Sequence, residues 1–412
     1  MAPENPRYKW YVVGLLACVA MVNYADRTAI SAVFPLVRHD LRMSDVALAA
    51  IGSFFLWSYA VGSPFAGVLA DRTSRSRMVV WSLVAWSVIT AASGLVRSSN
   101  ELLISRVLLG LAECAYLPAA VALLADHHAG PTRATAMGLH LAGLNFGLVA
   151  GGTLAGYLGD RFGWRPSFFV LGTAGVLLAL LASATLRDAA GPHREAAAPR
   201  ASLWLSVRTL ARIPTYNLAL ISAMLISIGT WIFFNWLPLY FKETFHMSLA
   251  GAGFSGTFTL QIAATIGVIA GGYLSDRASR DKPERRMLVG AVCYFLAGPF
   301  LITFATTAGF GLVSASIFSF AFLRAVGSIT EPTVACDLLP SHLRSTALAL
   351  MNSANCIAGG IGVMVAGFLK STFGLAGVFA GVSVILLIAG GVLLAAYAFF
   401  ARRDLQRREL VA

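Results

Sequence analysis

Charged residues are scarce in this chain, and their scarcity excludes an ordinary soluble domain. Only 12% of the 412 residues are Asp, Glu, Lys or Arg, whereas 58% are hydrophobic. A soluble globular domain usually has about 25% charged residues. Apolar stretches long enough to cross about 30 Å of hydrocarbon recur along the whole chain. The first, which begins at Trp10, is too long for a signal-peptide core and is interpreted as a retained helix.

Paired cysteines, metal-ligand clusters and catalytic motifs are also missing. The five cysteines lie inside apolar stretches with neither paired nor metal-like spacing; they are Cys18, Cys114, Cys293, Cys336 and Cys356. The sequence has no nucleophile motif, no nucleotide-binding loop and no filter-like repeat. It therefore predicts that the protein is not an enzyme, uses no metal or cofactor, and is not a channel.

The net charge of +12 follows a pattern typical of membrane topology and not of nucleic-acid binding. Basic residues lie in short loops, and the loops of one side hold most of them. That side carries Arg72, Arg75, Arg77, Arg277, Arg280, Lys282, Arg285, Arg286, Arg402, Arg403, Arg407 and Arg408. Because loops rich in Lys and Arg stay in the cytoplasm, we expect a multi-pass protein of the plasma (inner) membrane with both termini cytoplasmic. The partners expected are the lipid bilayer and a small solute, and no nucleic acid.

Twelve transmembrane helices are predicted, in two related bundles of six. They cover roughly residues 10–36, 45–70, 78–96, 102–125, 134–158, 166–186, 216–241, 249–274, 287–306, 310–336, 345–369 and 375–400. The predicted domains are an N-terminal bundle at 1–186, a cytoplasmic linker with an amphipathic helix at 187–213, and a C-terminal bundle at 214–412. Ser44 and Ser248 are predicted helix N-caps. The fold class is thus all-α, with two pseudo-symmetric six-helix bundles.

Glycine and proline inside the spans predict close packing and bends. The fifth span contains Gly138, Gly143, Gly147, Gly151, Gly152 and Gly156, most of them on one helix face. Pro118, Pro238 and Pro332 lie within or at the edges of spans, where a lost backbone hydrogen bond permits a bend.

Two ordered internal repeats indicate duplication, which is typical of solute carriers. The segment Gly67–Arg75 returns as Gly272–Arg280, and Asp126 with Arg133 returns as Asp337 with Arg344. Carboxylates at such span ends can pair with arginines or helix amides when one side of a carrier is closed. The predicted gating residues are Asp71, Arg72, Arg75, Asp126, Arg133, Asp276, Arg277, Asp337 and Arg344. The alternative is a static loop clamp that also sets topology.

Ionisable residues inside the spans give the sharpest functional signal, because each costs about 2.5–3.5 kcal/mol at the bilayer centre. They are Asp26, Arg27, Arg106, Glu113, Arg324 and Glu331. Glu113 lies about 20 Å from Asp126 along a helix, near mid-membrane, and Arg324 has the same depth in the second half. We expect proton coupling by Asp26, Glu113 and Glu331, and anion binding by Arg27 and Arg324.

Structural alternatives remain open for each of these ionisable residues. Asp26 and Arg27 could neutralise each other, and Glu113 could be a permanent partner of Arg27 or Arg106. Arg324 and Glu331, two turns apart, could form a static ion pair. Arg106 is interpreted as structural. Further residues that could line a solute path are Tyr24, Asn145, Trp231, Asn235, Gln261, Asn352 and Asn355, although each could equally bond helix to helix.

The repeated loop and the fourth span resemble the signature motifs of the major facilitator superfamily. The loop reads Gly67-x-Leu69-Ala70-Asp71-Arg72-x-x-Arg75, and the span contains Arg106-x-x-x-Gly110. Ser74 and Ser279 stand where the family usually has a second glycine. The likeness covers essentially the full chain.

Three stretches resemble the anion:cation symporters and the related spinster-like carriers in particular. They are Asn-Tyr-Ala-Asp-Arg at 23–27, Arg-Val-Leu-Leu-Gly-Leu-Ala-Glu-Cys-Ala-Tyr-Leu-Pro at 106–118 and Gly-Trp-Arg-Pro-Ser-Phe-Phe at 163–169. Ala112 replaces the group's usual glycine before the glutamate, and residues 337–347 lean toward the spinster-like proteins. The resemblance implies that Asp26, Arg27 and Glu113 couple protons and recognise the anion.

The sequence thus predicts a monomeric, proton-coupled symporter that moves a small organic anion, such as a sugar acid, by alternating access. The first alternative is a spinster-like exporter of a lysolipid or drug by proton antiport. The second, from another class, is a membrane sensor that transports nothing.

Overall fold

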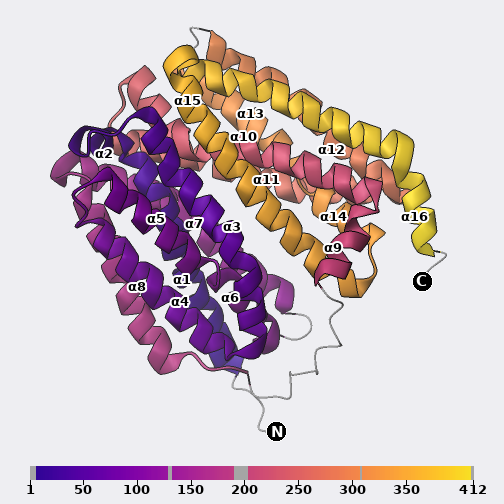
Figure 1. Cartoon of the computed structure of the whole chain (residues 1–412), viewed down its shortest axis with the longest axis horizontal. Helices are drawn as coiled ribbons and strands as arrows, with labels where there is room; N and C mark the ends of the chain where they lie inside the picture. The colour runs from indigo at the N-terminus through magenta and orange to yellow at the C-terminus, as the bar shows by residue number, and fades with distance from the viewer. Residues whose placement is uncertain (1–5, 129–131, 190–202, 307–308, 410–412) are drawn as a thin grey trace. The chain divides into compact units, whose positions relative to one another are not determined.

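The computed structural model describes residues 6–128, 132–189, 203–306 and 309–409, and every regular element in them is a helix (Figure 1). The first part of the chain forms α1 (Pro6–Ala32), α2 (Phe34–Asp40), α3 (Asp45–Arg72), α4 (Arg75–Ser93), α5 (Ser99–Glu113), α6 (Tyr116–His127), α7 (Arg133–Phe162) and α8 (Arg165–Thr185). The second part forms α9 (Leu203–Ala211), α10 (Pro214–Phe245), α11 (Leu249–Ala278), α12 (Arg286–Phe300), α13 (Phe310–Gly327), α14 (Thr330–Leu338), α15 (Ser341–Ala396) and α16 (Arg402–Glu409). Short 3-10 turns lie at Pro283–Arg285 and Leu301–Ala305, and a π turn lies at Tyr397–Ala401.

Eleven helical stretches among the described residues are long and apolar enough to cross a membrane. The last of them, Leu343–Gln406, contains Gly374 with φ 65° and ψ 172°, a conformation that suits glycine and breaks the helix there. Dividing the stretch at Gly374 yields the twelve predicted spans. The all-helical fold class is confirmed.

Two predicted spans are interrupted, at matching places in the two halves. α5 ends at Glu113 and α6 begins at Tyr116, whereas α13 ends at Gly327 and α14 begins at Thr330. Proline is the third residue of the following helix in both cases, at Pro118 and Pro332. Because proline has no N–H, a continuous helix would lose the bond to the carbonyl four residues earlier. Each interruption thus lies between an ionisable residue of its span and the proline predicted to permit a bend, and a bend there stays a prediction.

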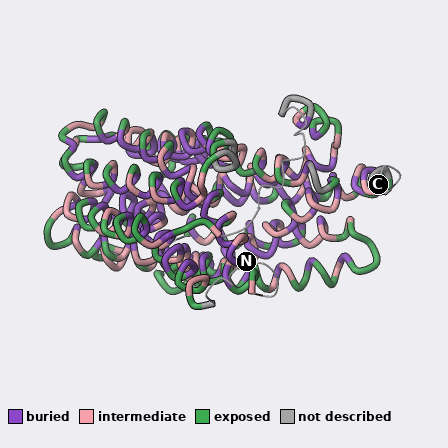
Figure 2. The backbone as a smooth tube through the Cα atoms, turned by 90° about the horizontal axis from the view of Figure 1, so that it is seen from below, coloured by how far each residue is buried: buried purple, intermediate pink, exposed green. Residues whose placement is uncertain are grey.

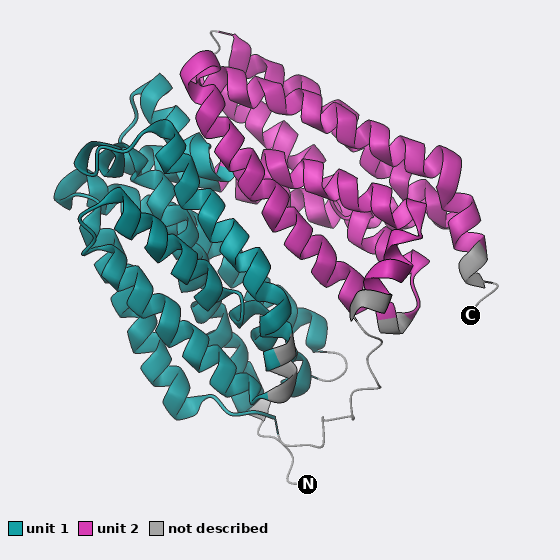
Figure 3. Cartoon of the chain, in the orientation of Figure 1, with its two compact units in different colours: residues 1–197, 234–257 teal, residues 198–233, 258–412 magenta. Residues whose placement is uncertain are grey.

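The chain divides into two compact units (Figure 3). Unit 1 contains residues 1–197 and 234–257, and unit 2 contains residues 198–233 and 258–412. α10 and α11 each contribute residues to both units. The division into bundles at 186 and 214 stays a prediction, and residues 190–202 of the predicted linker lie outside the described residues. Within unit 2, α9 buries Leu210 and exposes Arg208, which fits an amphipathic helix.

Both predicted N-caps are present. The Ser44 hydroxyl accepts the Ala47 N–H at 3.2 Å, and the Ser248 hydroxyl accepts the Gly251 N–H at 3.0 Å. The start of α11 has a further acceptor inside unit 1. Asp160, near the end of α7, accepts the Leu249 N–H through Oδ1 and the Ala250 N–H through Oδ2, both at 3.0 Å. The first three amides of α11 are therefore all satisfied.

Small residues let the helices of unit 1 approach closely. A methyl group added at Gly147 of α7 would lie 2.2 Å from the Met21 carbonyl oxygen of α1, and Gly143 and Gly151 face α1 in the same way. Gly138 has open space instead. Buried positions recur along the helices beside exposed ones (Figure 2), and large apolar side chains such as Trp81 are among the exposed. Exposed apolar side chains on long helices are what contact with lipid requires.

The α1–α7 contact yields a matched pair of substitutions. Gly147→Ala forces the two backbones apart and should lower stability by about 1–3 kcal/mol. Gly138→Ala adds the same methyl group where nothing opposes it and should leave stability unchanged or raise it slightly. Thermal unfolding of the two purified variants in detergent compares them directly. Equal midpoints would contradict the close α1–α7 contact.

Candidate functional site

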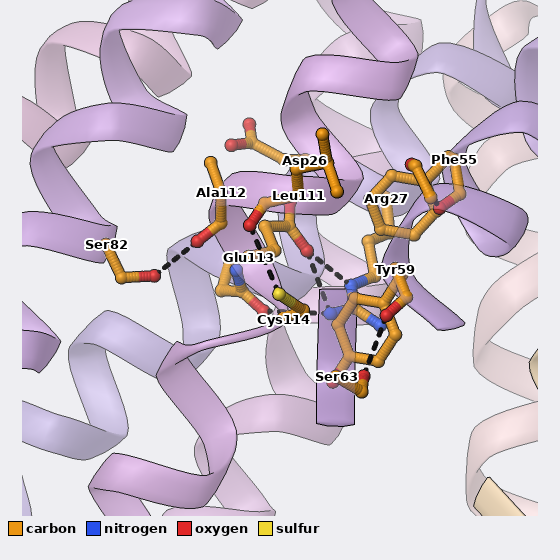
Figure 4. A network of polar contacts seen from close by, with 12 residues as sticks. Asp26, Arg27, Phe55, Tyr59, Ser63, Ser82, Leu111, Ala112, Glu113 and Cys114 are labelled. Carbon is orange, nitrogen blue, oxygen red and sulfur yellow. Dashed lines mark hydrogen bonds and ion pairs between the residues drawn. The ribbon is translucent and has the colours of Figure 1, made fainter. Parts of the chain in front are cut away.

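The central feature of unit 1 is an ion pair between Arg27 of α1 and Glu113 at the end of α5 (Figure 4). Arg27 Nε donates to Glu113 Oε2 at 2.9 Å, and Nη2 lies 2.8 Å from the same oxygen. Arg27 Nη2 also donates to Asn23 Oδ1 at 3.4 Å. Glu113 is the last helical residue before the break in its span, so its carboxyl group lies where backbone geometry changes.

The two members of the pair differ in exposure. The Arg27 side chain exposes 9% of its surface, whereas the Glu113 side chain exposes none. Glu113 Oε1 is buried and receives no hydrogen bond from any described residue. Within this pair, exposure is therefore confined to the Arg27 side chain. The sequence left open whether Glu113 pairs with Arg27 or with Arg106, and the structure contains the pair with Arg27.

Asp26, next to Arg27 in the chain, bonds to a different partner. Its Oδ2 accepts the Thr90 hydroxyl of α4 at 2.9 Å, and its buried Oδ1 has no hydrogen-bond partner among the residues described. Arg106 of α5 is also buried; its Nη2 donates to the Ser93 hydroxyl at 3.1 Å. Unit 1 therefore encloses two carboxyl and two guanidinium groups, so the formal charges of these side chains can cancel.

Aromatic rings surround the Arg27 guanidinium on the sides that Glu113 leaves free. The guanidinium carbon lies 4.3 Å from the centre of the Tyr24 ring and 5.1 Å from the centres of the Phe55 and Tyr59 rings. Each such contact is worth about 0.5–2 kcal/mol, and most when desolvated. Tyr24 was predicted from the sequence, but Phe55 and Tyr59 were missed. Their spacing of four residues puts them on one face of α3, although it does not say which helix that face meets.

The structure does not contain the alternative of a static ion pair between Arg324 and Glu331 in unit 2. Arg324 Nη1 donates to the Thr230 hydroxyl at 3.3 Å. Glu331 Oε1 accepts the Tyr294 hydroxyl at 2.7 Å and the Ser222 hydroxyl at 3.1 Å. The break between α13 and α14 separates the two residues, so the helical spacing that would align them does not hold. Tyr294 and Ser222 gave no distinct sequence signal.

The other predicted path-lining residues lie in both units. In unit 1, Asn145 is half-buried, and Asn235 is buried against Gly52. In unit 2, Trp231 packs on Gly359, Gln261 and Asn355 are half-buried, and Asn352 is exposed. Of these residues, Tyr24 contacts a predicted anion-binding arginine, Arg27.

Two of the predicted gating residues form an ion pair in unit 1. Arg75, at the start of α4, pairs with Asp126 of α6 and also donates to the Ala122 carbonyl at 3.2 Å. Arg133 is exposed. The side chains of Asp71 and Arg72 lie outside the described residues.

Asp188, which follows α8, ties the chain to the start of α4. Its Oδ1 accepts the Ser76 N–H at 2.8 Å. Burial alone would raise the pKa of Asp188, but hydrogen bonds from Ser74 and Ser76 and the nearby Arg75 charge outweigh burial, so its pKa lies below the ordinary value. This carboxylate is therefore charged at neutral pH.

In unit 2 the equivalent contacts centre on Arg286, which sequence reasoning missed as a gating candidate. Its Nη1 lies 3.0 Å from Asp276 Oδ1, and its Nε lies 3.2 Å from Asp337 Oδ2. Arg286 and Asp337 line a polar cavity of about 610 Å³. Arg277 is exposed, and Arg344 Nε donates to the Leu339 carbonyl at 3.0 Å. In unit 2 the ion pair with Asp337 is thus made by Arg286 at the start of α12, and not by Arg280, which is the repeat of Arg75.

The fold and these buried charges define a class: polytopic helical membrane carriers. In the part of the chain that the structure describes, no three His, Cys, Asp or Glu residues are grouped as a metal site requires. The family model described as Major Facilitator Superfamily matches residues 16–363. The chain therefore belongs to the major facilitator superfamily, and it is a transporter and not an enzyme.

Known proteins resemble the chain over most of its length. It is 26% identical to an MFS-type efflux pump of Mycolicibacterium smegmatis, over 99% of this chain and 96% of the pump. It is 28% identical to a probable galactarate/D-glucarate transporter of Bacillus subtilis, over 67% of this chain and 66% of that protein. A solved bacterial homolog of the human lysosomal transporter Spinster, inward-facing and occupied, matches with a TM-score of 0.80 at 21% identity, with 98% of each chain covered.

The Asp26–Thr90 hydrogen bond yields a stability prediction. Thr90→Val keeps the shape of the side chain but leaves both Asp26 oxygens without a donor, which should cost about 1–3 kcal/mol. Thr153→Val is the matched control, because the Thr153 hydroxyl donates to Val149 of its own helix. Thermal unfolding midpoints of the two variants test the difference. If both substitutions have the same effect, Thr90 does not stabilise Asp26.

Proposed function

We propose that the protein is a proton-coupled secondary transporter that carries a small organic anion by alternating access. The observation that carries this proposal is the buried Arg27–Glu113 pair, in which an arginine side chain with slight exposure is bound to a glutamate side chain with none. Ionisable groups at this depth cost several kcal/mol unless they are paired, which makes a purely accidental placement expensive.

Proton binding to Glu113 and anion binding to Arg27 are coupled at this pair. When Glu113 is ionised, it neutralises Arg27. When Glu113 takes a proton on the unpaired Oε1, Arg27 loses its counter-charge and can bind a solute carboxylate instead. Both states are neutral overall, so either can be enclosed between the two sides of the membrane at a low electrostatic cost. The two ligands therefore favour each other.

The remaining polar groups have supporting roles in the proposal. Asp26, with its unpaired Oδ1, is a second proton site in unit 1. In unit 2, Glu331 is a proton site held by two hydroxyl groups, and Arg324 is a second anion-binding residue. Arg75 with Asp126, and Arg286 with Asp276 and Asp337, act as gating contacts. The protein works as a monomer in the inner membrane, with both termini in the cytoplasm.

The solute class follows from the guanidinium and from the relatives. A guanidinium binds planar carboxylates well, often with two parallel hydrogen bonds. The similarity to a probable galactarate/D-glucarate transporter supports a sugar acid as the solute.

A second candidate function is export by proton antiport, with a drug or lysolipid as the solute. It is favoured by the match to an efflux pump along 99% of the chain and by the likeness to the Spinster homolog. The two candidates require opposite coupling. With labelled solute in proteoliposomes, a symporter accumulates solute on the side to which protons flow, and an antiporter accumulates it on the side from which they come.

The solute class can be tested before transport is measured. Thermal shifts of the purified protein with galactarate, D-glucarate, other carboxylic acids and lysophospholipids, at two pH values, identify which class stabilises it. Stabilisation by sugar acids supports import of an anion, whereas stabilisation by lysophospholipids alone supports the export candidate.

Glu113→Gln tests the proposed coupling. The amide keeps the size of the side chain but cannot release a proton, so accumulation driven by a pH gradient should be lost while solute exchange at equal pH partly remains. Uptake of the stabilising solute into proteoliposomes measures both activities. Glu101→Gln, an exposed change on the same helix, is the control and should retain both. Undiminished pH-driven accumulation by Glu113→Gln would exclude Glu113 as the coupling site.

A further inference from the structure

Glu113 and three aromatic rings contact the guanidinium of Arg27, and a proton can neutralise Glu113 but not the rings. Glu113 Oε2 binds it through Nε and Nη2. The rings of Tyr24, Phe55 and Tyr59 lie around the same group at 4.3–5.1 Å. The electron-rich faces of the rings attract a cation whether or not Glu113 is ionised. The rings are therefore a constant partner, and the carboxylate is a switchable one.

A glycine of α5 determines where two of these rings lie. A methyl group on Gly110 would stand 2.1 Å from the Ser58 hydroxyl oxygen, 2.5 Å from the Phe55 carbonyl oxygen and 3.0 Å from the Tyr59 nitrogen. α5 thus contacts the backbone of α3 between Phe55 and Tyr59. Gly110 precedes Glu113 by about one helical turn. The same close contact therefore brings the carboxylate of α5 and the rings of α3 to one guanidinium (Figure 4).

Burial strengthens the attraction between the rings and the guanidinium. Phe55 and Tyr59 expose 7% and 5% of their surface, so water does not compete with their rings for the cation. Tyr24 is half-buried, and the Phe55 and Tyr59 rings lie 6.2 Å apart, which lets both face Arg27. Cation–π attraction is strongest in such a desolvated setting.

We infer that Tyr24, Phe55 and Tyr59 form an aromatic cage that keeps the Arg27 guanidinium in place when Glu113 takes up a proton. The inference rests on the proposed function, because it concerns the step in which Arg27 exchanges Glu113 for a solute carboxylate. Without the cage, the freed arginine would move among several rotamers and lose its alignment with the anion. Phe55 and Tyr59 are positioning residues, which act on the solute through Arg27.

The cage has a consequence that simple packing does not have. With Glu113 ionised, loss of one ring removes a secondary partner of Arg27. With Glu113 neutral, loss of the same ring removes part of what still holds the cation. A ring deletion should therefore be more harmful when Glu113 is neutral. The other ionisable groups near this pair are Asp26 of α1, Arg106 of α5 and Cys114, and all three are present in every variant compared below.

A set of full-length variants tests this consequence without any solute. Tyr59→Leu removes the ring, Tyr59→Phe keeps it, and each is made in the natural chain and in the Glu113→Gln background, which mimics the protonated carboxyl group. Tyr59→Leu should lower the thermal unfolding midpoint by roughly 2–4 °C more in the Glu113→Gln background than in the natural chain. Tyr59→Phe should behave like Tyr59 in both, because its ring is retained.

The outcomes separate the cage from ordinary packing. An equal or smaller effect of Tyr59→Leu in the Glu113→Gln background overturns the inference, because lost packing would be independent of Glu113. If Tyr59→Leu does not fold, Phe55→Leu replaces it in the same comparison. An equal or smaller effect in the Glu113→Gln background then overturns the inference in the same way.

Transport supplies a second and separate readout. Uptake of labelled D-glucarate by proteoliposomes should show a raised KM for Tyr59→Leu, with little change for Tyr59→Phe. If the natural chain does not take up D-glucarate, the solute assigned under the proposed function fails, while the stability comparison still decides on the cage. If D-glucarate is transported and Tyr59→Leu has an unchanged KM, the cage does not position Arg27 for the anion.

Discussion

Arg27 and Glu113 carry opposite charges at a depth where an unpaired charge is costly, and much of unit 1 is arranged to keep them together. α1 supplies the guanidinium, α5 ends at the carboxylate, and α3 adds rings that contact the cation. An ion pair removed from water is stable only if its members are held at short range and their remaining polar atoms are satisfied. Here one carboxylate oxygen is left without a donor, which gives a proton somewhere to bind.

Close helix packing is what allows such a pair to exist among apolar side chains. Gly143, Gly147 and Gly151 bring α7 against α1, and Gly110 brings α5 against α3. In lipid, helices associate through close backbone contact and van der Waals packing, because burial of apolar surface offers little advantage there. The glycines therefore position the charges indirectly, by fixing the distances between the helices that carry them.

Much of the architecture could be predicted from the sequence, because apolar length, loop charge and repeats are local signals. The breaks after Glu113 and Gly327 follow from Pro118 and Pro332, and the importance of Glu113 follows from the cost of burying it. The residues that contact these buried ionisable groups were harder to predict from the sequence. Phe55 and Tyr59 lie on one face of α3, but only the contact at Gly110 determines that this face meets Arg27. In the same way, Glu331 bonds to Tyr294 and Ser222, which come from helices distant in the chain, and no local pattern pairs them.

Asp160 belongs to one helix and completes the amino end of another, and this sharing has a mechanical consequence. Parting α7 from α11 would strip Leu249 and Ala250 of their acceptor, and both amides would then have to bond with water. Each exchanged hydrogen bond alters the free energy by only about 0.5–1.5 kcal/mol, or somewhat more with a charged acceptor. The end of α7 and the start of α11 are therefore tied inside unit 1 by one carboxylate that serves two amides.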